Sequence, residues 1–153
     1  MIGNITPEMP SRLVSYLLPG APGLLLTCGS DGYPSSAYTW LLGLDAGHLR
    51  FAVDQGGSAM GNLERSGQAA VQVIGAGNVV FLVKGRTRKL RERIAAAEPA
   101  GIALYEMAVY GAKDQSWPGV TTTALAYEWP PENRAAMLQM EQAVYQEMRE
   151  ARA

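Results

Sequence analysis

A glycine-containing stretch at residues 54–67, DQGGSAMGNLERSG, has the residue types of a phosphate-binding turn. It follows the strand-like HLRFAV and opens a short predicted helix, whose first backbone N–H groups could hold an anion, with Ser58 as the N-cap. A basic side chain normally accompanies such backbone donors. Here Ala59, Met60 and Gly61 stand where a Lys or Arg would be expected. The stretch therefore predicts either a phosphate site without its usual cation or a plain turn that begins a helix.

A cationic stripe is the second candidate for binding chemistry. In KGRTRKLRER, Lys84, Arg86 and Arg88 fall on one face of a predicted strand, because alternate residues of a strand point the same way. The stripe is either a solvated strand edge or a replacement for the missing phosphate cation, supplied by the same or by a second subunit. The net charge of the chain is -1 and no aromatic platform accompanies the stripe, so we expect no nucleic-acid binding.

The remaining reactive residues indicate neither a metal site nor a nucleophile. The single His48 and the single Cys28 lie far apart in the sequence, without a cluster of acidic residues beside them. We expect Cys28 to be a small buried side chain, and it has no second cysteine to pair with. No apolar run approaches the roughly 20 residues that cross a bilayer, and the first residues lack a signal-peptide pattern. We therefore expect a cytoplasmic protein that does not enter a membrane.

The elements that position these residues belong to a chain of 153 residues, which is the usual size of one domain. Thr6 as N-cap, followed by Pro7, predicts a helix that runs through SRLVSYLL. From residue 23 onward, three apolar or alternating runs are separated by the turn sequences SDG and DAG, which predict an antiparallel meander. After the short helix, the runs QAAVQVI and NVVFLVKGRTRKL predict two more strands joined by a glycine-rich turn.

Three later segments complete the expected fold. Residues 101–115, GIALYEMAVYGAKDQ, mix helix formers with strand formers, and their periodicity leaves both structures open. The following TTTALAYEW is β-rich. The last segment predicts an amphipathic helix, whose apolar face consists of Met137, Met140, Val144 and Met148. Five or six closely spaced strands with peripheral helices predict a small closed or split barrel.

The order of these motifs resembles the FMN-binding split-barrel family, the pyridoxamine 5′-phosphate oxidase-like proteins. The resemblance covers residues 13–91 and rests on Thr27 at a strand end, the turn DGYP at residues 31–34, and the helix start at residues 58–63. It implies a mainly β fold, a six-stranded antiparallel split β-barrel with peripheral helices, one of them at the C-terminus. It also implies that residues 102–112 form a strand, and that a homodimer holds FMN across its subunit interface.

The resemblance further implies which residues contact the cofactor. The implied set is Tyr38, Thr39, Trp40, Phe51, Ala52, Val53, Gly57, Ser58, Met60 and Asn62, and the cationic stripe adds Lys84 and Arg86. Tyr38 and Trp40 share one strand face, and packing in the core is their alternative role. Met60 stands where the family has a phosphate-binding Lys, so the charge-assisted contact that anchors FMN is absent at this position.

Three functions fit these residues. The leading hypothesis is an FMN-binding oxidoreductase-like homodimer with an unknown substrate. It is not a true pyridoxamine phosphate oxidase, because the C-terminal Trp- and Arg-containing segment that holds that substrate has no counterpart here. The second hypothesis is a non-catalytic module that binds haem, another tetrapyrrole or a deazaflavin, and the third is a dimeric relative that has lost its ligand. We expect a homodimer in each case, since the methionine-rich helix face would otherwise be exposed.

Overall fold

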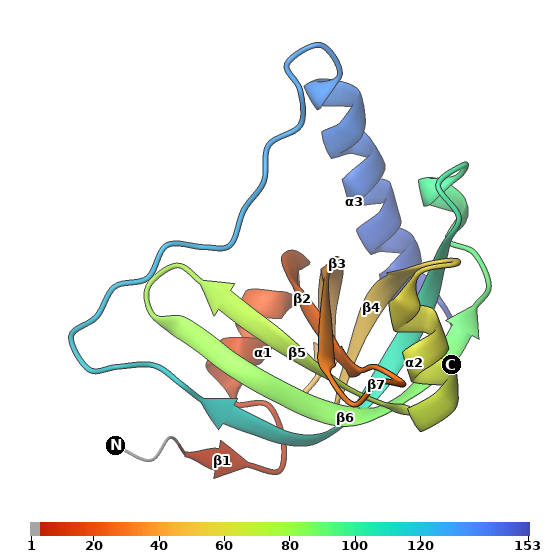
Figure 1. Ribbon diagram of the computed structural model, residues 1–153. Helices are drawn as coiled ribbons and strands as arrows, with labels where there is room; N and C mark the ends of the chain where they lie inside the picture. The colour runs from red at the N-terminus through yellow and green to blue at the C-terminus, as the bar shows by residue number, and fades with distance from the viewer. Residues whose placement is uncertain (1–3) are drawn as a thin grey trace.

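Six antiparallel strands close into a barrel in the computed structural model of the chain, which describes residues 4–153 (Figure 1). Around the barrel the strands follow the order β7-β4-β3-β2-β5-β6, and β6 pairs again with β7. The barrel strands are β2 (Ala21–Cys28), β3 (Pro34–Asp45), β4 (His48–Asp54), β5 (Gln68–Gly75), β6 (Val79–Arg91) and β7 (Ile102–Asp114). The short β1 (Ile5–Thr6) extends the sheet beyond β7. The six-stranded antiparallel barrel expected from the sequence is therefore confirmed.

Tight turns join β2 to β3, β3 to β4 and β5 to β6, as the turn sequences predict. The side chain of Asp31 accepts a hydrogen bond from the backbone N–H of Tyr33 at 3.0 Å, and Asp45 accepts one from Gly47 at 2.8 Å. Such bonds fold the chain back locally and set the register of each hairpin. Residues 102–112, which the sequence left open between helix and strand, lie within β7. Pairing with both β4 and β6 outweighs their helix propensity.

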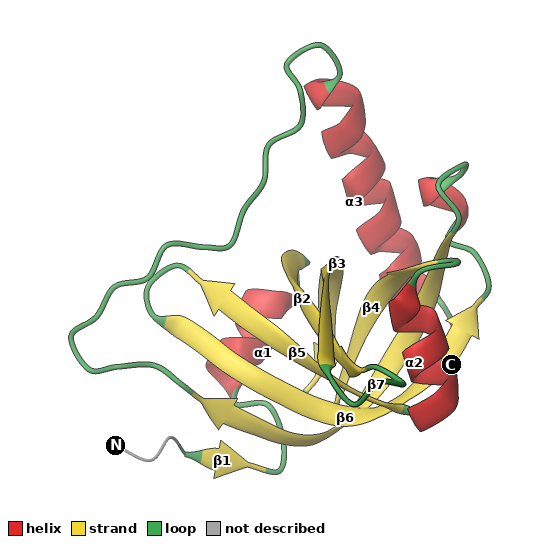
Figure 2. Ribbon diagram, viewed as in Figure 1, coloured by secondary structure: helices red, strands yellow, loops and turns green. Residues whose placement is uncertain are grey.

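Within residues 4–153, three α-helices accompany the barrel. They are α1 (Ser11–Leu17), α2 (Ser58–Ser66) and α3 (Arg134–Glu150), drawn in red in Figure 2. The predicted positions of α2 and of the C-terminal helix are confirmed. Gly67 ends α2 with a positive φ of 64°, a conformation that favours glycine. No helix of residues 4–153 is long and apolar enough to cross a membrane.

Two predicted helix starts are wrong. Thr6 lies in β1, where its hydroxyl donates a hydrogen bond to the carbonyl of Glu8 at 2.6 Å, and α1 begins only after Pro10. Ser58 is the first residue inside α2, and Gly57 occupies the N-cap position without a side-chain capping bond. The N-cap of α1 is Pro10, four residues after Thr6, and the N-cap of α2 is Gly57, directly before Ser58.

The core has two parts. The first fills the barrel and joins inward-facing strand residues such as Phe51 and Phe81 to the buried face of α1. The second lies outside the barrel, where β3, β4 and β7 meet α3 and the 3₁₀ segment η1 (Ala95–Ala97). Val144 and Met148 are fully buried in this second part. The expectation that the methionine-rich face of α3 stays bare in a lone subunit is therefore wrong.

A long segment without helix or strand connects β7 to α3. We call residues 115–133 the strap; Figures 1 and 2 show it passing the β5–β6 turn and then rising to the start of α3. Five hydrogen bonds join it to residues 74–78, at and beside that turn, including one from the backbone N–H of Leu125 to the carbonyl of Ile74 at 2.9 Å. The β-rich TTTALAYEW lies in the strap and forms no strand, because it makes only isolated bonds to β5 and none of the repeated pairs of a ladder.

Candidate functional site

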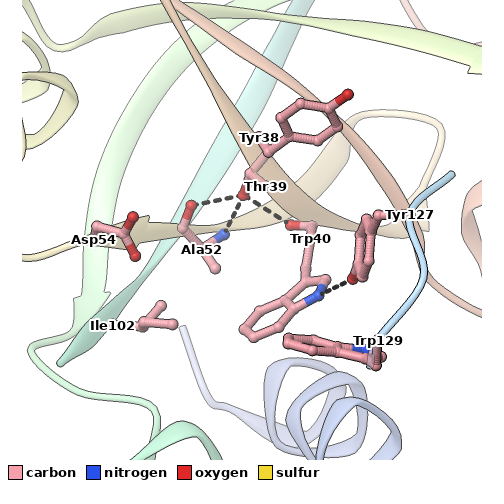
Figure 3. A pocket seen from close by; sticks show the side chains of 8 residues that line it. All are labelled: Tyr38, Thr39, Trp40, Ala52, Asp54, Ile102, Tyr127 and Trp129. Atoms are coloured by element: carbon pink, nitrogen blue, oxygen red, sulfur yellow. Dashed lines mark hydrogen bonds between the residues drawn. The ribbon is translucent and has the colours of Figure 1, made fainter. Parts of the chain in front are cut away.

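An aromatic pocket opens on the outer side of β3 and β4, beside the strap (Figure 3). Its volume is about 190 Å³. We define this aromatic pocket by its eight lining residues, which are Tyr38, Thr39, Trp40, Ala52, Asp54, Ile102, Tyr127 and Trp129. Four of them, Tyr38, Thr39, Trp40 and Ala52, belong to the set that the sequence predicted for a cofactor. The fold brings these four together from two neighbouring strands.

Thr39 fixes the floor of the pocket. Its hydroxyl donates a hydrogen bond to the carbonyl of Ala52 at 2.6 Å and accepts one from the Ala52 backbone N–H at 3.1 Å. These bonds tie β3 to β4 beyond their regular pairing, which begins at Leu41 and Phe51. The Thr39 hydroxyl thus both donates and accepts a bond within the barrel wall, and Thr39 and Ala52 line the pocket side by side.

The aromatic wall of the pocket combines residues distant in sequence. The indole N–H of Trp40 donates a hydrogen bond to the Tyr127 hydroxyl at 2.8 Å, and Figure 3 shows both rings facing the pocket. Tyr127 and Trp129 meet edge to face, with ring centroids 5.7 Å apart. Burial and a hydrogen bond to Glu141 on α3 raise the pKa of Tyr127 well above its usual value, so this phenol stays protonated at neutral pH. The wall is thus neutral and mostly apolar.

The predicted phosphate loop adjoins the pocket at Asp54. Gly57 and Ser58 are exposed at the start of α2, and the backbone N–H of Gly57 donates a hydrogen bond to the carbonyl of Asp54 at 3.4 Å, so the donors that remain begin at Ser58. Met60 is half-buried and packs against the barrel core. Asn62 is buried, and its amide donates a hydrogen bond to the hydroxyl of Thr27 at 3.0 Å. Backbone donors are therefore available near the pocket, whereas Met60 and Asn62 serve packing and internal bonding.

The other predicted residues lie elsewhere. Phe51 and Val53 point into the barrel core, because they alternate with Ala52 along β4. Lys84 and Arg86 line a separate groove of about 810 Å³, together with Gln68 and Tyr110. This groove lies at the C-terminal end of α2, since Arg86 pairs with Gln68 two residues after that helix. Within one subunit, the cationic stripe is not brought together with the phosphate loop at the other end of α2.

Four pocket residues were not predicted from the sequence. Asp54 follows the predicted strand directly, so its position at a strand end beside a glycine-rich turn was a usable signal. Ile102 begins β7 opposite Asp54, a pairing that only the register of the barrel reveals. Tyr127 and Trp129 reach the pocket through the strap, whose path has no periodic pattern in the sequence.

Cys28 and His48 both lie at the surface. Cys28 is exposed, contrary to expectation, because it follows the inward-facing Thr27 on β2 and so points outward. His48 lies at the edge of a hairpin, as expected, with its Nδ1 2.9 Å from the Asp45 carboxylate. Within residues 4–153, no group of three or more His, Cys, Asp or Glu side chains is arranged to hold a metal ion.

Solved structures share this fold at low sequence identity. A candidate pyridoxamine 5′-phosphate oxidase from Lactobacillus delbrueckii is 18% identical, with a TM-score of 0.57 over 73% of this chain and 98% of its own. An F420 reductase is 19% identical, with a TM-score of 0.57 over 72% of this chain and 100% of its own. A FAD-binding protein from Mesorhizobium loti is 17% identical, with a TM-score of 0.50 over 71% of this chain and 97% of its own.

Comparisons by sequence give no further assignment. No protein-family model matches the chain. No curated protein matches it either. The structural likeness agrees with the order of motifs in the sequence, from Thr27 to the helix start at Ser58. The chain has the split β-barrel fold of the pyridoxamine 5′-phosphate oxidase-like proteins.

Proposed function

We propose that this protein binds a flavin-type cofactor, with FMN as the leading candidate, and serves as an oxidoreductase-like protein. The observation that carries the proposal is the aromatic pocket, in which Tyr38, Trp40 and the strap residues Tyr127 and Trp129 surround a slot on an otherwise filled barrel. Solved proteins with the same fold include an F420 reductase and a FAD-binding protein, which supports a cofactor of this class.

The pocket fits the ring system of such a cofactor. Ligand sites are mostly apolar and contain a few polar groups that orient the ligand. Here the walls offer aromatic faces for stacking, while the exposed Tyr38 hydroxyl and the Asp54 carboxylate provide polar groups at the edge. A bound flavin supplies hydride-transfer chemistry, and the protein then supplies position and exclusion of water. Asp54 would accept a hydrogen bond from a ring N–H, and the indoles would cover the ring faces.

The phosphate end fits less well. The exposed start of α2, from Ser58 onward, offers backbone N–H groups and the positive end of the helix dipole. Position 60 supplies no cation, because Met60 is apolar and packs on the core, and the nearby Asp54 is acidic. We therefore expect weak binding of FMN through its phosphate. A deazaflavin offers a ring of the same kind, so the pocket supports it as well.

A second copy of the chain would complete this small site. The volume of about 190 Å³ is below the ~300–1,000 Å³ that is typical of ligand pockets. Outward-facing apolar residues on the adjoining sheet remain partly exposed in the single chain; we call this the outer sheet face, and it consists of Leu24, Leu26, Ala70, Ile74, Val80 and Leu82. Gln72 lies among these residues, paired with Leu24 and Leu82, and the rest of the face is apolar. An exposed patch with this much apolar surface is typical of a subunit interface. These features support a homodimer with the cofactor at its interface.

Haem is the alternative ligand that the pocket favours least. Haem iron is commonly held by His, Cys or Met side chains, although Tyr also occurs. The eight lining residues include none of the first three, and the phenol of Tyr127 is occupied by its bonds to Trp40 and Glu141. A non-catalytic module that binds a tetrapyrrole would therefore depend on Tyr38, and a flavin ring is the better fit.

The test combines a spectrum with a titration. Flavin absorbance in the purified protein, or quenching of FMN fluorescence on addition of the protein, would support the proposal. Tyr38→Ala should weaken FMN binding about two- to tenfold, because an aromatic pair contributes about 0.5–1.5 kcal/mol. Tyr33→Ala is the matched control, since both tyrosines are exposed, at 63% and 73%, but only Tyr38 lines the pocket. No binding of FMN or a deazaflavin would overturn the proposal.

A further inference from the structure

One carboxylate oxygen gathers the donors of the aromatic pocket. Oε1 of Glu141, on α3, accepts hydrogen bonds from the indole N–H of Trp129 at 3.0 Å and of Trp40 at 3.4 Å. It also accepts a hydrogen bond from the hydroxyl of Tyr127. These three aromatic residues come from β3 and the strap, and all three line the pocket. Glu141 itself is not among the lining residues.

The same aromatic residues separate two hollows. Tyr127 and Trp129 line the aromatic pocket on one side and a larger hollow of about 630 Å³ on the other. This larger hollow is lined by Tyr16 on α1 and Tyr145 on α3, among others. With open space on both sides, these two rings pack mainly against each other, so they lack the close packing that fixes side chains in a protein interior. The rings therefore need a specific bond to keep their position.

We propose that Glu141 is the positioning residue that fixes the aromatic walls of the pocket. By accepting all three bonds, it holds the two strap rings against Trp40 and keeps their N–H and O–H groups turned away from the ligand space. The pocket consequently presents ring faces rather than hydrogen-bond donors. It selects a flat, conjugated ligand whose polar groups lie at its edge, where Tyr38 and Asp54 are placed.

This inference deepens the proposed function and rests on it for the identity of the ligand. Hydrogen bonds to an ionised group are stronger than those between neutral groups, so the charge of Glu141 matters as well as its oxygen. Loss of the carboxylate would leave Trp40 and Trp129 without their common acceptor. The strap rings could then move toward the larger hollow, and the ligand would have to order them again on binding.

The experiment compares Glu141→Leu and Glu141→Gln with the wild type, by amide and indole hydrogen exchange in NMR spectra. The protein has three tryptophans, and Trp117 is 65% exposed, so its indole serves as an internal control. In Glu141→Leu, the indole N–H groups of Trp40 and Trp129 should exchange much faster while that of Trp117 stays unchanged. The dissociation constant for FMN should rise at least about tenfold. Glu141→Gln, which retains an acceptor oxygen without charge, should be intermediate in both measurements.

Glu150→Leu is the matched control, because Glu150 is exposed on the same helix and bonds only to the neighbouring Gln146 and not to the pocket. It should match the wild type. Fast indole exchange with unchanged FMN affinity in Glu141→Leu would overturn the positioning role. Unchanged exchange would overturn the bonding pattern itself. If the wild type binds no flavin, the proposed function fails, and the difference in exchange between Glu141→Leu and Glu150→Leu still decides whether Glu141 fixes the walls.

Discussion

Arg50 on β4 and Glu106 on β7 lie opposite each other in the barrel and form a buried ion pair, with Arg50 Nε 3.0 Å from Glu106 Oε2. The guanidinium also donates hydrogen bonds to the carbonyls of Met148 at 2.7 Å and Ala151 at 2.6 Å, at the end of α3. One side chain therefore links the barrel wall to the last turn of the helix that carries Glu141. This pair connects the stability of the fold to the geometry of the pocket.

Substitution of Arg50 should destabilise the protein strongly. Removing one partner of a buried ion pair costs about 3–5 kcal/mol, because the other charge is left without full compensation. Arg50→Met should lower the free energy of unfolding by this amount in urea denaturation followed by circular dichroism. Arg88→Met is the control, because Arg88 bonds to the same carboxylate but its side chain is 57% exposed, and exposed pairs contribute about 0–1 kcal/mol. Equal losses in the two variants would contradict the assigned role of Arg50.

The same pair predicts how stability depends on pH. Burial alone would raise the pKa of Glu106, but hydrogen bonds from Arg88 and Arg50 lower it below its ordinary value of 4.5. A carboxylate with a lowered pKa in the folded state contributes stability above its unfolded pKa, and this contribution is lost as the pH falls through the folded value. The free energy of unfolding should therefore fall below about pH 4.5. Glu106→Gln should show a smaller decline over that range in parallel urea titrations, and curves that remain parallel would argue against this origin.

Two glycines should respond in opposite ways to alanine. A Cβ on Gly85 would lie 2.3 Å from the carbonyl oxygen of Ala108, so Gly85→Ala should cost about 1–3 kcal/mol through overpacking at the β6–β7 bulge. A Cβ on Gly61 would meet no atom within 4 Å on the exposed side of α2. Gly61→Ala should therefore stabilise by up to about 1 kcal/mol. Thermal unfolding of both variants measures the contrast, and a gain for Gly85→Ala would refute the register described for these strands.

The barrel was predictable from the sequence because its signals are local. Asp31 and Asp45 form the turns that their sequence positions indicate, and inward and outward residues alternate along β2 as a half-buried strand requires. The assignment of β7 came from the resemblance alone. Its composition favours a helix as much as a strand, and pairing on both sides decides the outcome.

The pocket was only half predictable, for a physical reason. Tyr38 and Trp40 follow from strand alternation, so a resemblance that identifies the strand also identifies the side chains. Tyr127, Trp129 and Glu141 meet through hydrogen bonds between segments that no pattern relates. The expected dimer contact through Met148 was wrong because α3 docks on its own barrel, with Arg50 bonded to its last turn.

A charge on the outer sheet face should prevent dimerisation. Leu82 points outward from β6 and is partly exposed in the single chain, so a buried carboxylate at this position would be costly in a subunit interface. Leu82→Glu should sediment as a monomer at micromolar concentration, whereas the wild type should sediment as a dimer. Leu138→Glu is the control, since Leu138 is 47% exposed on α3 and does not belong to the outer sheet face. A wild-type monomer would contradict the proposed homodimer, and a dimeric Leu82→Glu would place the interface elsewhere.

Met60 provides the sharpest test of the phosphate end. Met60→Lys adds an ammonium group in the first turn of α2, which begins at the exposed Ser58, where the proposed FMN phosphate would bind. The aliphatic part of the lysine can keep the packing of Met60 against the core while its charge reaches solvent. A hydrogen bond to a charged group contributes about 1.5–3 kcal/mol, so FMN affinity should increase by about ten- to a hundredfold.

Fluorescence titration of FMN into both proteins at two salt concentrations distinguishes this contact from a general charge effect. The gain in Met60→Lys should shrink as salt increases, because a partly exposed ammonium–phosphate pair is screened. Gly61→Lys is the matched control: it adds the same charge one residue further along α2, at a position whose Cβ would meet no atom within 4 Å. It should change the affinity little. An equal gain in both variants would show that net charge alone attracts the ligand, and tight wild-type binding without any gain would mean that another cation, such as Lys84 or Arg86 from the second subunit, already contacts the phosphate.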